Sequence, residues 1–326
     1  MQLIINTYGS YLHVKQSSFE IKADGKKKRV SAKKIDSILI TTGAAISSDA
    51  VKLALENNIE VQFLDHFGRS MGKVWHSKMG STTYIRRRQL ELVDNEEGTK
   101  LIKKIMVEKA ENMIKHLYDL GIKRGEEKQN YSFETIEGME ELKNKITKLT
   151  GPVEMMRSTL MGYEGNISRK YFDALNFLLP DRYKFKKRTF RPAEDEFNCL
   201  LNYGYGVLYG KVEKALIIAG LDPYVGILHT DGYNKKSFVY DFIEIYRHHI
   251  DRIVMKLFSR KKIRKSYFDE IKNGVTLNKE GKEVFLTALN KYFDESIYYK
   301  GRQIKIDNTI QFDCHYLANK IIEEGE

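Results

Sequence analysis

Residues 154–178, EMMRSTLMGYEGNISRKYFDALNFL, carry the pattern that decides how this chain folds. Residues three or four positions apart share one side of a helix, and apolar residues recur here at that spacing. The stretch therefore predicts one long core helix. Its expected inner face comprises Leu160, Glu164, Ile167, Tyr171, Leu175 and Leu178.

Glu164 interrupts this apolar face and is the first candidate for a functional residue. An ionised carboxylate that leaves water loses on the order of several kcal/mol unless a metal ion, a cation or several donors replace that water. Two plainer interpretations are open. The face could end in a groove with Glu164 solvated at its lip, or the carboxylate could pair with an arginine.

Two periodicities divide the chain near residue 80. Short β-rich runs with glycine-containing turns fill the first 80 residues, around one helix capped by Ser47 or Ser48. Helical patterns dominate from Thr82 onward, and the four prolines lie between them, where helical chains tolerate proline. We predict an α+β fold, with a small β-rich domain at residues 1–80 and a larger all-α catalytic domain at residues 81–326.

The expected elements follow these runs. The expected strands are Gln2–Ile5, Tyr11–Val14, Phe19–Lys22, Ile35–Ile40, Ile59–Leu64 and Lys73–Trp75. The expected helices of the larger domain are Leu101–Leu120, Glu154–Leu178, Phe197–Ala219, Phe238–Phe258 and Lys282–Tyr298. We predict a loop for the polar segment 121–132.

Composition indicates an anionic partner and a reducing compartment. The chain has 326 residues, 42% of them hydrophobic, and its 55 basic and 44 acidic residues leave a net charge of +11. Nucleic acid is the commonest anionic partner of a basic protein, although membrane surfaces or solubility also fit. The two cysteines, Cys199 and Cys314, suggest neither a disulfide framework nor a thiolate metal cage. Without a signal peptide or an apolar run of about 18 residues, we expect a cytoplasmic protein with no membrane partner.

A second group of candidate residues follows the turn-like segment 221–224. His229 closes a short apolar stretch, and a helix capped by Ser237 would bring several polar side chains to one face. These side chains are Asp241, Glu244, His248 and Asp251. One histidine with two or three carboxylates suits magnesium or manganese, whereas zinc sites carry more nitrogen or sulfur. The plainer alternatives are a hydrogen-bonded structural histidine and the solvated side of an amphipathic helix.

Two basic runs are candidates for phosphate binding. The first run interleaves cations with Tyr183, Phe185 and Phe190, so that cations could contact a DNA backbone while aromatic rings stack on a frayed base. Its cations are Arg182, Lys184, Lys186, Lys187, Arg188 and Arg191. The second run, residues 256–265, contains no acidic residue. Either run could also be an ordinary solvated surface.

An ordered series of motifs spans residues 163–247. The motifs are Tyr163-Glu164-Gly165, Arg191-Pro192-Ala193-Glu194-Asp195 with Asn198, Tyr203-Gly204-Tyr205, Ala219-Gly220-Leu221-Asp222-Pro223, Gly226-Ile227-Leu228-His229 and Tyr240-Asp241-Phe242-Ile243-Glu244 with Arg247. This series resembles the CRISPR-associated protein one family, the universal CRISPR adaptation enzymes. Outside the series, the resemblance rests on the order of a small β domain and a larger helical one.

The resemblance implies a metal-dependent DNA endonuclease and integrase that inserts short DNA fragments, or spacers, into a CRISPR array in antiviral defence. By motif position, Glu164, His229 and Glu244 would bind Mg²⁺ or Mn²⁺, with Asp241 as an additional catalytic carboxylate. It also implies double-stranded DNA as substrate, a homodimer formed through the β-rich domain, and CRISPR-associated protein two as partner. Ala193, Ile245 and His248 depart from the family pattern, which puts helix ends and DNA contacts in doubt.

Two other classes of function compete with this one. A structure-selective repair nuclease could use the same metal site on branched DNA. A non-catalytic scaffold could carry DNA on its basic surface, with structural carboxylates. Joined DNA products would indicate the integrase, cut products alone would indicate the repair nuclease, and the absence of both would indicate the scaffold.

Overall fold

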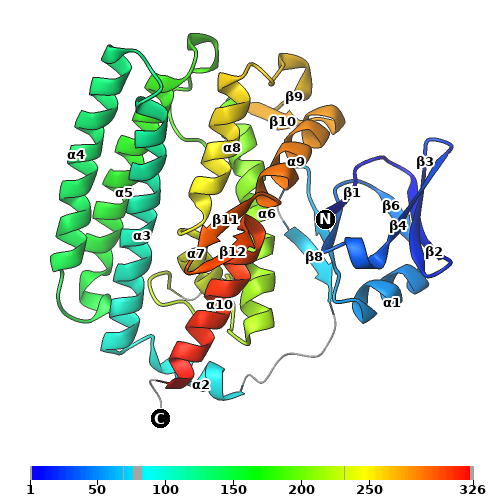
Figure 1. Ribbon diagram of the computed structural model, residues 1–326, viewed down its shortest axis with the longest axis horizontal. Coiled ribbons are helices and arrows are strands. Elements are labelled where there is room, and N and C mark those ends of the chain that lie inside the picture. The colour runs from blue at the N-terminus through cyan, green and yellow to red at the C-terminus, as the bar shows by residue number, and fades with distance from the viewer. Residues whose placement is uncertain (1, 69, 76–82, 231, 324–326) are drawn as a thin grey trace. The chain divides into compact units, whose positions relative to one another are not determined.

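The structure is a computed structural model that describes residues 2–68, 70–75, 83–230 and 232–323 (Figure 1). A strand-rich N-terminal region precedes a mostly helical one, which confirms the predicted α+β fold class. The chain divides into two compact units. One comprises residues 1–79, 189–210 and 263–307, and the other comprises residues 80–188, 211–262 and 308–326. The domain boundary at residue 80 stays a prediction, and residues 189–210 and 263–307 are grouped with the strand-rich region.

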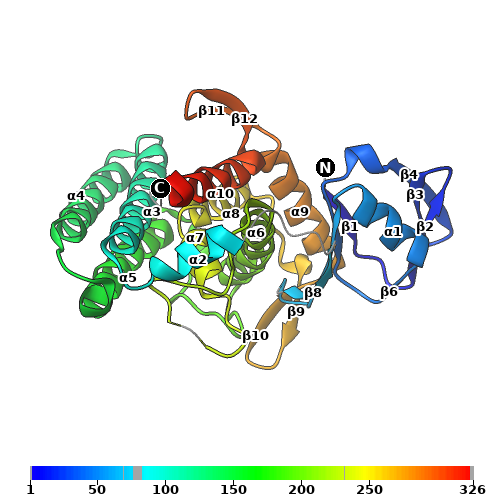
Figure 2. The same cartoon turned by 90° about the horizontal axis from the view of Figure 1, so that it is seen from below.

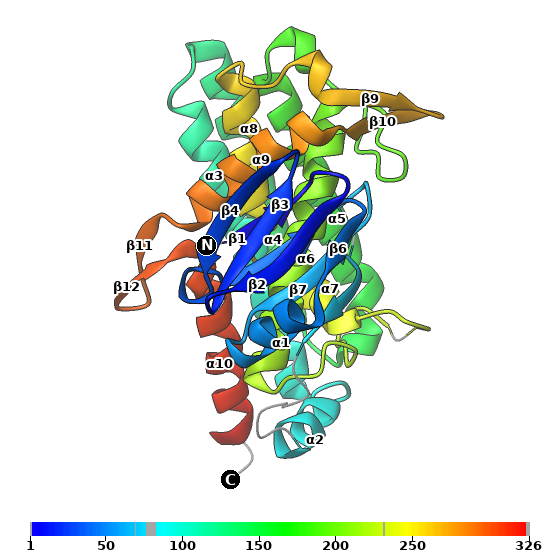
Figure 3. The same cartoon turned by 90° about the vertical axis from the view of Figure 1, so that its right-hand side faces the viewer.

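The N-terminal region contains two four-stranded sheets and one helix (Figure 3). The sheets have the strand orders β1-β5-β7-β8 and β4-β3-β2-β6. The bounds are β1 (Gln2–Ile5), β2 (Ser10–Lys15), β3 (Ser18–Ala23), β4 (Lys26–Ser31), a 3₁₀ turn (Ala32–Lys34), β5 (Ser37–Ile40), β6 (Ala44–Ile46), α1 (Ser48–Glu56), β7 (Glu60–Leu64) and β8 (Ser70–Val74). Buried side chains such as Leu12, Phe19, Ile38 and Val61 form the core.

In this region, local chemistry explains why one predicted helix cap is confirmed and why one strand is not predicted. Ser47 is the cap of α1, because its hydroxyl accepts a hydrogen bond from the Ala50 N–H at 3.2 Å. Strand β4 is absent from the sequence-based expectations, since its sequence KKKRVS buries only Val30 and lacks the alternation of a half-buried strand. Charged residues of this kind are typical of edge strands, and β4 lies at one edge of its sheet.

The same unit as the N-terminal region contains two hairpins that the sequence patterns do not predict. Residues 265–267 form a 3₁₀ turn, followed by β9 (Phe268–Ile271), β10 (Gly274–Leu277), α9 (Lys279–Phe293), β11 (Ser296–Tyr299) and β12 (Arg302–Lys305). The predicted helix 282–298 is therefore wrong beyond Phe293. Lys300 and Gly301 both have positive φ, 45° and 82°, which is the geometry of a tight two-residue hairpin turn. Figure 2 shows this hairpin extending away from α9.

Helices dominate the remainder of the chain. Their bounds are α2 (Thr83–Glu91), α3 (Glu96–Gly121), α4 (Glu126–Lys148), α5 (Val153–Leu178), a 3₁₀ turn (Asp181–Tyr183), α6 (Glu196–Ala219), α7 (Ser237–Ile243), α8 (Arg247–Ser259) and α10 (Ile306–Glu323). Helices α3, α4 and α5 lie side by side (Figure 1). Helix α5 confirms the long helix predicted for residues 154–178. Within the described chain, no helix is long and apolar enough to cross a membrane.

Helix α4 corrects the prediction of a loop at residues 121–132. Only residues 122–125 separate α3 from α4. The residues that α4 buries are Ser132, Met139 and Ile146, which recur every seventh position and form a single narrow row. A helix that buries so few side chains carries a weak apolar signal, so its sequence resembles a polar loop.

The predicted helix 238–258 is interrupted at residues 244–246, between α7 and α8. Asn112 of α3 donates a side-chain hydrogen bond to the Ile245 carbonyl at 3.0 Å, and His248 Nδ1 contacts the same oxygen at 2.9 Å. Side chains that insert into the helical hydrogen-bond ladder break a helix in this way. The break places Glu244 just past the end of α7.

Candidate active site

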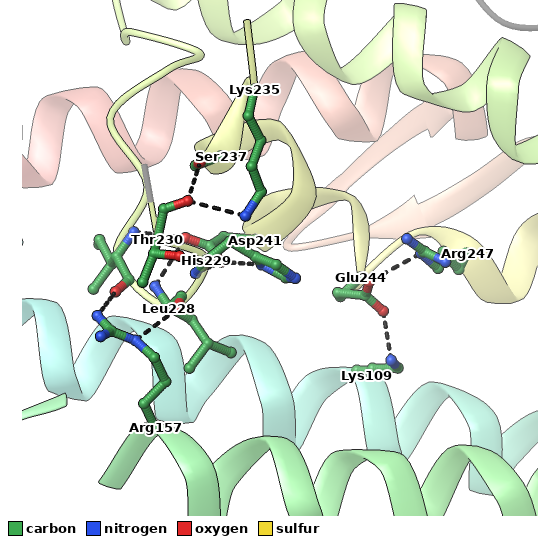
Figure 4. Close-up of polar contacts among 11 residues, drawn as sticks. Lys109, Arg157, Leu228, His229, Thr230, Lys235, Ser237, Asp241, Glu244 and Arg247 are labelled. Atoms are coloured by element: carbon green, nitrogen blue, oxygen red, sulfur yellow. Dashed lines mark hydrogen bonds and ion pairs between the residues drawn. The ribbon is translucent and has the colours of Figure 1, made fainter. Parts of the chain in front are cut away.

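Asp241 organises the loop that carries His229 (Figure 4). Its fully buried carboxylate accepts backbone N–H hydrogen bonds from Ile227 at 2.7 Å, Leu228 at 3.1 Å and His229 at 3.0 Å. It also lies 2.7 Å from His229 Nδ1. Because these donors satisfy both carboxylate oxygens, Asp241 fixes the backbone and the imidazole of the loop together.

The orientation of His229 leaves one ring nitrogen open. An Nδ1–H that donates to Asp241 leaves the lone pair on Nε2, which makes no hydrogen bond to any described residue. The side chain is 28% exposed, so this nitrogen can be reached. A carboxylate behind one nitrogen and a free lone pair on the other is the usual arrangement of a metal-binding histidine.

Two further contacts fix the His229 loop. Arg157 of α5 donates to the carbonyls of Leu228 at 2.9 Å and Ile227 at 3.3 Å. Gly226 leaves no room for a side chain, since a Cβ there would lie 2.4 Å from Ser237 Cβ and 2.6 Å from the His229 carbonyl oxygen. The close approach of the loop to α7 therefore requires glycine at position 226.

Glu164 and Glu244 meet at a single cation, Lys109 of α3. The Lys109 ammonium contacts Glu164 Oε1 and lies 2.5 Å from Glu244 Oε2. Arg247 Nε lies 3.0 Å from the other oxygen of Glu244, and the Ser168 hydroxyl donates to Glu164 at 2.8 Å. The cation that balances Glu164 is thus a lysine, where the sequence had suggested an arginine as the plain alternative.

Burial and charge act against each other in this cluster. Burial alone would raise the pKa of Glu244, but the Arg247 and Lys109 cations lower it below its usual value. Burial alone would lower the pKa of Lys109, but the Glu244 and Glu164 carboxylates raise it. Both partners are therefore charged at neutral pH.

The remaining polar residues of the predicted helix face have other partners. Asp251 accepts a hydrogen bond from the Tyr171 hydroxyl at 3.1 Å, and that hydroxyl lies 2.6 Å from His116 Nδ1. Asp241, Glu244 and Asp251 are all buried, so the alternative of a solvated helix side is wrong. Because the helix is interrupted at residues 244–246, the polar residues predicted to share one helix face lie on two helices and the turn between them.

The donor set fits a divalent ion of the magnesium or manganese class. It offers two carboxylates and one imidazole nitrogen, and Glu244 Oε2 is a buried oxygen whose partner is the Lys109 ammonium. Among the described residues, no three histidine, cysteine, aspartate or glutamate side chains are gathered as a metal-binding group.

The first basic run is mostly exposed, but its aromatic residues are not. Arg182, Lys184, Lys186, Lys187 and Arg191 are exposed and Arg188 is partly buried. Tyr183 and Phe185 are buried, whereas Phe190 is 62% exposed, so only Phe190 of the three could stack on a base. Arg191 falls in the strand-rich unit and the other five cations fall in the helical unit.

Lys109 is the residue of this cluster that sequence reasoning missed. It lies in α3 among the buried residues Ile102, Met106 and Met113, at helical spacing. A lysine that interrupts an apolar face is the same signal that singled out Glu164. That signal could have singled out Lys109 as a candidate, although it does not identify Glu164 as its partner.

The fold and site define an α+β protein whose helical region carries two glutamates and a carboxylate-held histidine, side chains of the types that can bind a divalent ion. The family model described as "CRISPR associated protein Cas1" matches residues 3–291, so the chain belongs to the Cas1 family. It is 30% identical over 322 residues to the CRISPR-associated endonuclease Cas1 1 of Archaeoglobus fulgidus, covering 95% of this chain and 93% of that protein. It is 29% identical over 318 residues to the CRISPR-associated endonuclease Cas1 of Methanocaldococcus jannaschii, covering 96% and 92%.

Solved structures share the fold. A Cas1 protein from Thermotoga maritima superimposes with a TM-score of 0.83 at 21% identity, covering 99% of this chain and 97% of that one. A casposase bound to an integration product superimposes with a TM-score of 0.84 at 21% identity, covering 99% and 91%.

Proposed function

We propose that this chain is a metal-dependent DNA endonuclease and integrase of CRISPR adaptation, which inserts short DNA fragments into a CRISPR array. Membership of the Cas1 family supports this function, and so does the endonuclease name of the Archaeoglobus fulgidus relative. The observation that carries the proposal is the histidine loop: Asp241 takes His229 Nδ1 and leaves the Nε2 lone pair available on a side chain that is 28% exposed.

Each residue of the site has a distinct proposed role. Glu164, His229 and Glu244 hold Mg²⁺ or Mn²⁺, and Asp241 positions His229 without touching the ion, because its oxygens already accept four hydrogen bonds. A bound divalent ion polarises the phosphodiester and lowers the pKa of an attacking hydroxyl. A 3′-hydroxyl of the incoming DNA would give strand transfer, and water would give hydrolysis.

The proposed DNA surface is the first basic run. Arg182, Lys184, Lys186, Lys187, Arg188 and Arg191 would contact phosphates, which binds DNA without regard to sequence. Phe190 is the exposed aromatic residue of this run that could stack on a frayed base.

We further propose a homodimer formed through the β-rich region, with the small adaptation protein Cas2 as partner. One structural neighbour is a Cas6-RT-Cas1–Cas2 complex, which superimposes with a TM-score of 0.80 at 23% identity. Acting on array DNA in antiviral defence would place the protein in the cytoplasm. The two described cysteines are free, as a reducing compartment allows.

The testing experiment incubates the purified protein, with and without its small partner, with Mn²⁺, a supercoiled array plasmid and a labelled duplex bearing 3′-hydroxyls. We expect label covalently joined to the plasmid in the wild type and none in Glu164→Gln or His229→Ala. Cut but unjoined plasmid, again lost in these variants, would favour the repair nuclease. Tight DNA binding without either reaction would favour the scaffold.

A further inference from the structure

Lys109 is held where three elements of the helical unit converge. It comes from α3, Glu164 from α5, and Glu244 from the turn after α7. Its side chain is only 7% exposed. One ammonium therefore bridges two carboxylates from distant parts of the chain, and Arg247 supplies the second positive charge.

Lys109 and a metal ion bound between the two glutamates would compete for the same carboxylate oxygens. Glu164 Oε1 and Glu244 Oε2 both contact the ammonium. A divalent ion that bridged these two oxygens would lie about 2.0–2.6 Å from each, in the place that the ammonium holds. Two like charges at such a distance also repel strongly.

Arg247 makes an exchange of cations feasible. It contacts Glu244 Oε1, while Lys109 contacts Oε2. Glu244 can therefore stay in position through Arg247 when the partner of Oε2 changes. On Glu164, the Ser168 hydroxyl donates to Oε1, the same oxygen that Lys109 contacts.

We propose that Lys109 is a built-in cation that holds Glu164 and Glu244 together until the metal ion displaces it. This inference rests on the metal-binding role proposed above for the two glutamates. The displaced ammonium remains tethered to α3 beside the ion, where it can pair with an oxygen of the DNA phosphate. Lys109 thus acts as a positioning residue that competes with the metal.

The first test compares Mn²⁺ binding to full-length wild type, Lys109→Met and Lys143→Met by isothermal titration calorimetry, without DNA. Methionine keeps much of the length of the lysine side chain but removes its charge. We expect Lys109→Met to bind Mn²⁺ about tenfold more tightly or better, because no cation has to be displaced. Lys143 is a matched control, since it also contacts two glutamates, Glu111 and Glu140. Its removal should leave Mn²⁺ affinity unchanged.

Thermal unfolding supplies a second readout. Lys109→Met leaves two carboxylates facing each other without the ammonium, so its melting temperature should fall in the presence of a chelator. Saturating Mn²⁺ should raise the melting temperature of Lys109→Met by more than that of the wild type.

Wild-type protein gives a test that does not depend on folding of the variant. Acetic anhydride should modify Lys109 several times faster with saturating Mg²⁺ than with a chelator, as read by peptide mass spectrometry. Modification of Lys143 should not respond to the metal. Metal-independent labelling of Lys109 would overturn the proposal.

Two outcomes separate this inference from the proposed function. If Mn²⁺ binding is lost in Glu244→Gln but equal in wild type and Lys109→Met, then Lys109 does not compete and only this inference fails. If Mn²⁺ binding is indifferent to Glu164→Gln and Glu244→Gln, the metal site itself is assigned wrongly, and both fail.

Discussion

Asp241 lies 2.7 Å from His229 Nδ1 and accepts the backbone N–H of the same residue at 3.0 Å. The carboxylate thus sets both where the histidine lies and which ring nitrogen carries the proton. Both properties follow from contacts within the chain.

Replacing Asp241 by asparagine should weaken the metal site without removing any proposed ligand. The amide is close in size, but its NH2 would face a backbone N–H or His229 Nδ1 in place of an accepting oxygen, so we expect Mn²⁺ affinity to fall by about 10–100-fold. Calorimetric titration measures this. Asp251→Asn is the matched control, because Asp251 is equally buried and bonds Tyr171. Equal losses in both variants would indicate general destabilisation instead of histidine positioning.

Gly226→Ala should distort the His229 loop. Its Cβ would overlap Ser237 and the His229 carbonyl, and overpacking of this kind costs about 1–3 kcal/mol of unfolding free energy. Urea unfolding measures the loss. Gly162→Ala in α5 is the control, since nothing lies within 4 Å of its added methyl group. Alanine should stabilise that helix slightly, by about 0.5–1 kcal/mol.

Stability should fall on mild acidification because of three histidines, of which His116 and His249 are buried and His248 is half-buried. Burial lowers the pKa of His116 and His249 well below the usual range and that of His248 to about 3, and the Arg252 cation acts in the same direction. Each histidine stays neutral in the folded state, while the unfolded state takes up a proton below about pH 6.5. The folded state therefore loses about 1.4 kcal/mol per pH unit for each such histidine once pH is below that value.

Urea unfolding at pH values of about 7.5, 6.5 and 5.5, on either side of the ordinary histidine pKa, tests this sign. We expect the unfolding free energy to decrease steadily on the acid side, and to decrease less steeply in His116→Gln. His315→Gln, which removes an exposed histidine, should keep the wild-type pH dependence. A stability that rises on acidification would contradict the buried neutral state of these rings.

Neutralising the basic run should reduce the electrostatic part of DNA binding. In Lys186→Gln/Lys187→Gln, affinity for any duplex should decrease, and the slope of log affinity against log salt should shrink by about 0.9 for each phosphate that the protein no longer neutralises. Lys145→Gln/Lys148→Gln in α4 removes the same charge from another exposed surface. If both double variants change the slope equally, the effect is net charge and the run is not the binding surface.

Sequence patterns predict those parts of this molecule that depend on neighbouring residues. The α5 face, the Ser47 cap and most N-terminal strands follow from periodicity within short windows. The end of α7 does not, because it depends on Asn112, which is 133 residues from Ile245. Lys109 pairs with Glu164 at a separation of 55 residues, and no local rule connects them.

The site shows the same limit. Sequence motifs bring out Glu164, His229, Asp241 and Glu244 as candidates, but they cannot assign different tasks to Asp241 and Glu244. These carboxylates are three residues apart on one short helix and its end. Only the fold reveals that Asp241 faces backbone amides while Glu244 faces two cations. The contacts of each carboxylate, and therefore its chemical role, are set by the tertiary structure.

The narrow buried row of α4, one residue in every seven, has a practical consequence for anyone working with this protein. Inserting a single residue between Ser132 and Met139 would rotate the rest of the helix by about 100° and turn Met139 and Ile146 outward. Substitutions elsewhere on α4 disturb no such row. Single cysteines on its outer face therefore offer attachment points for fluorophores that leave the fold intact.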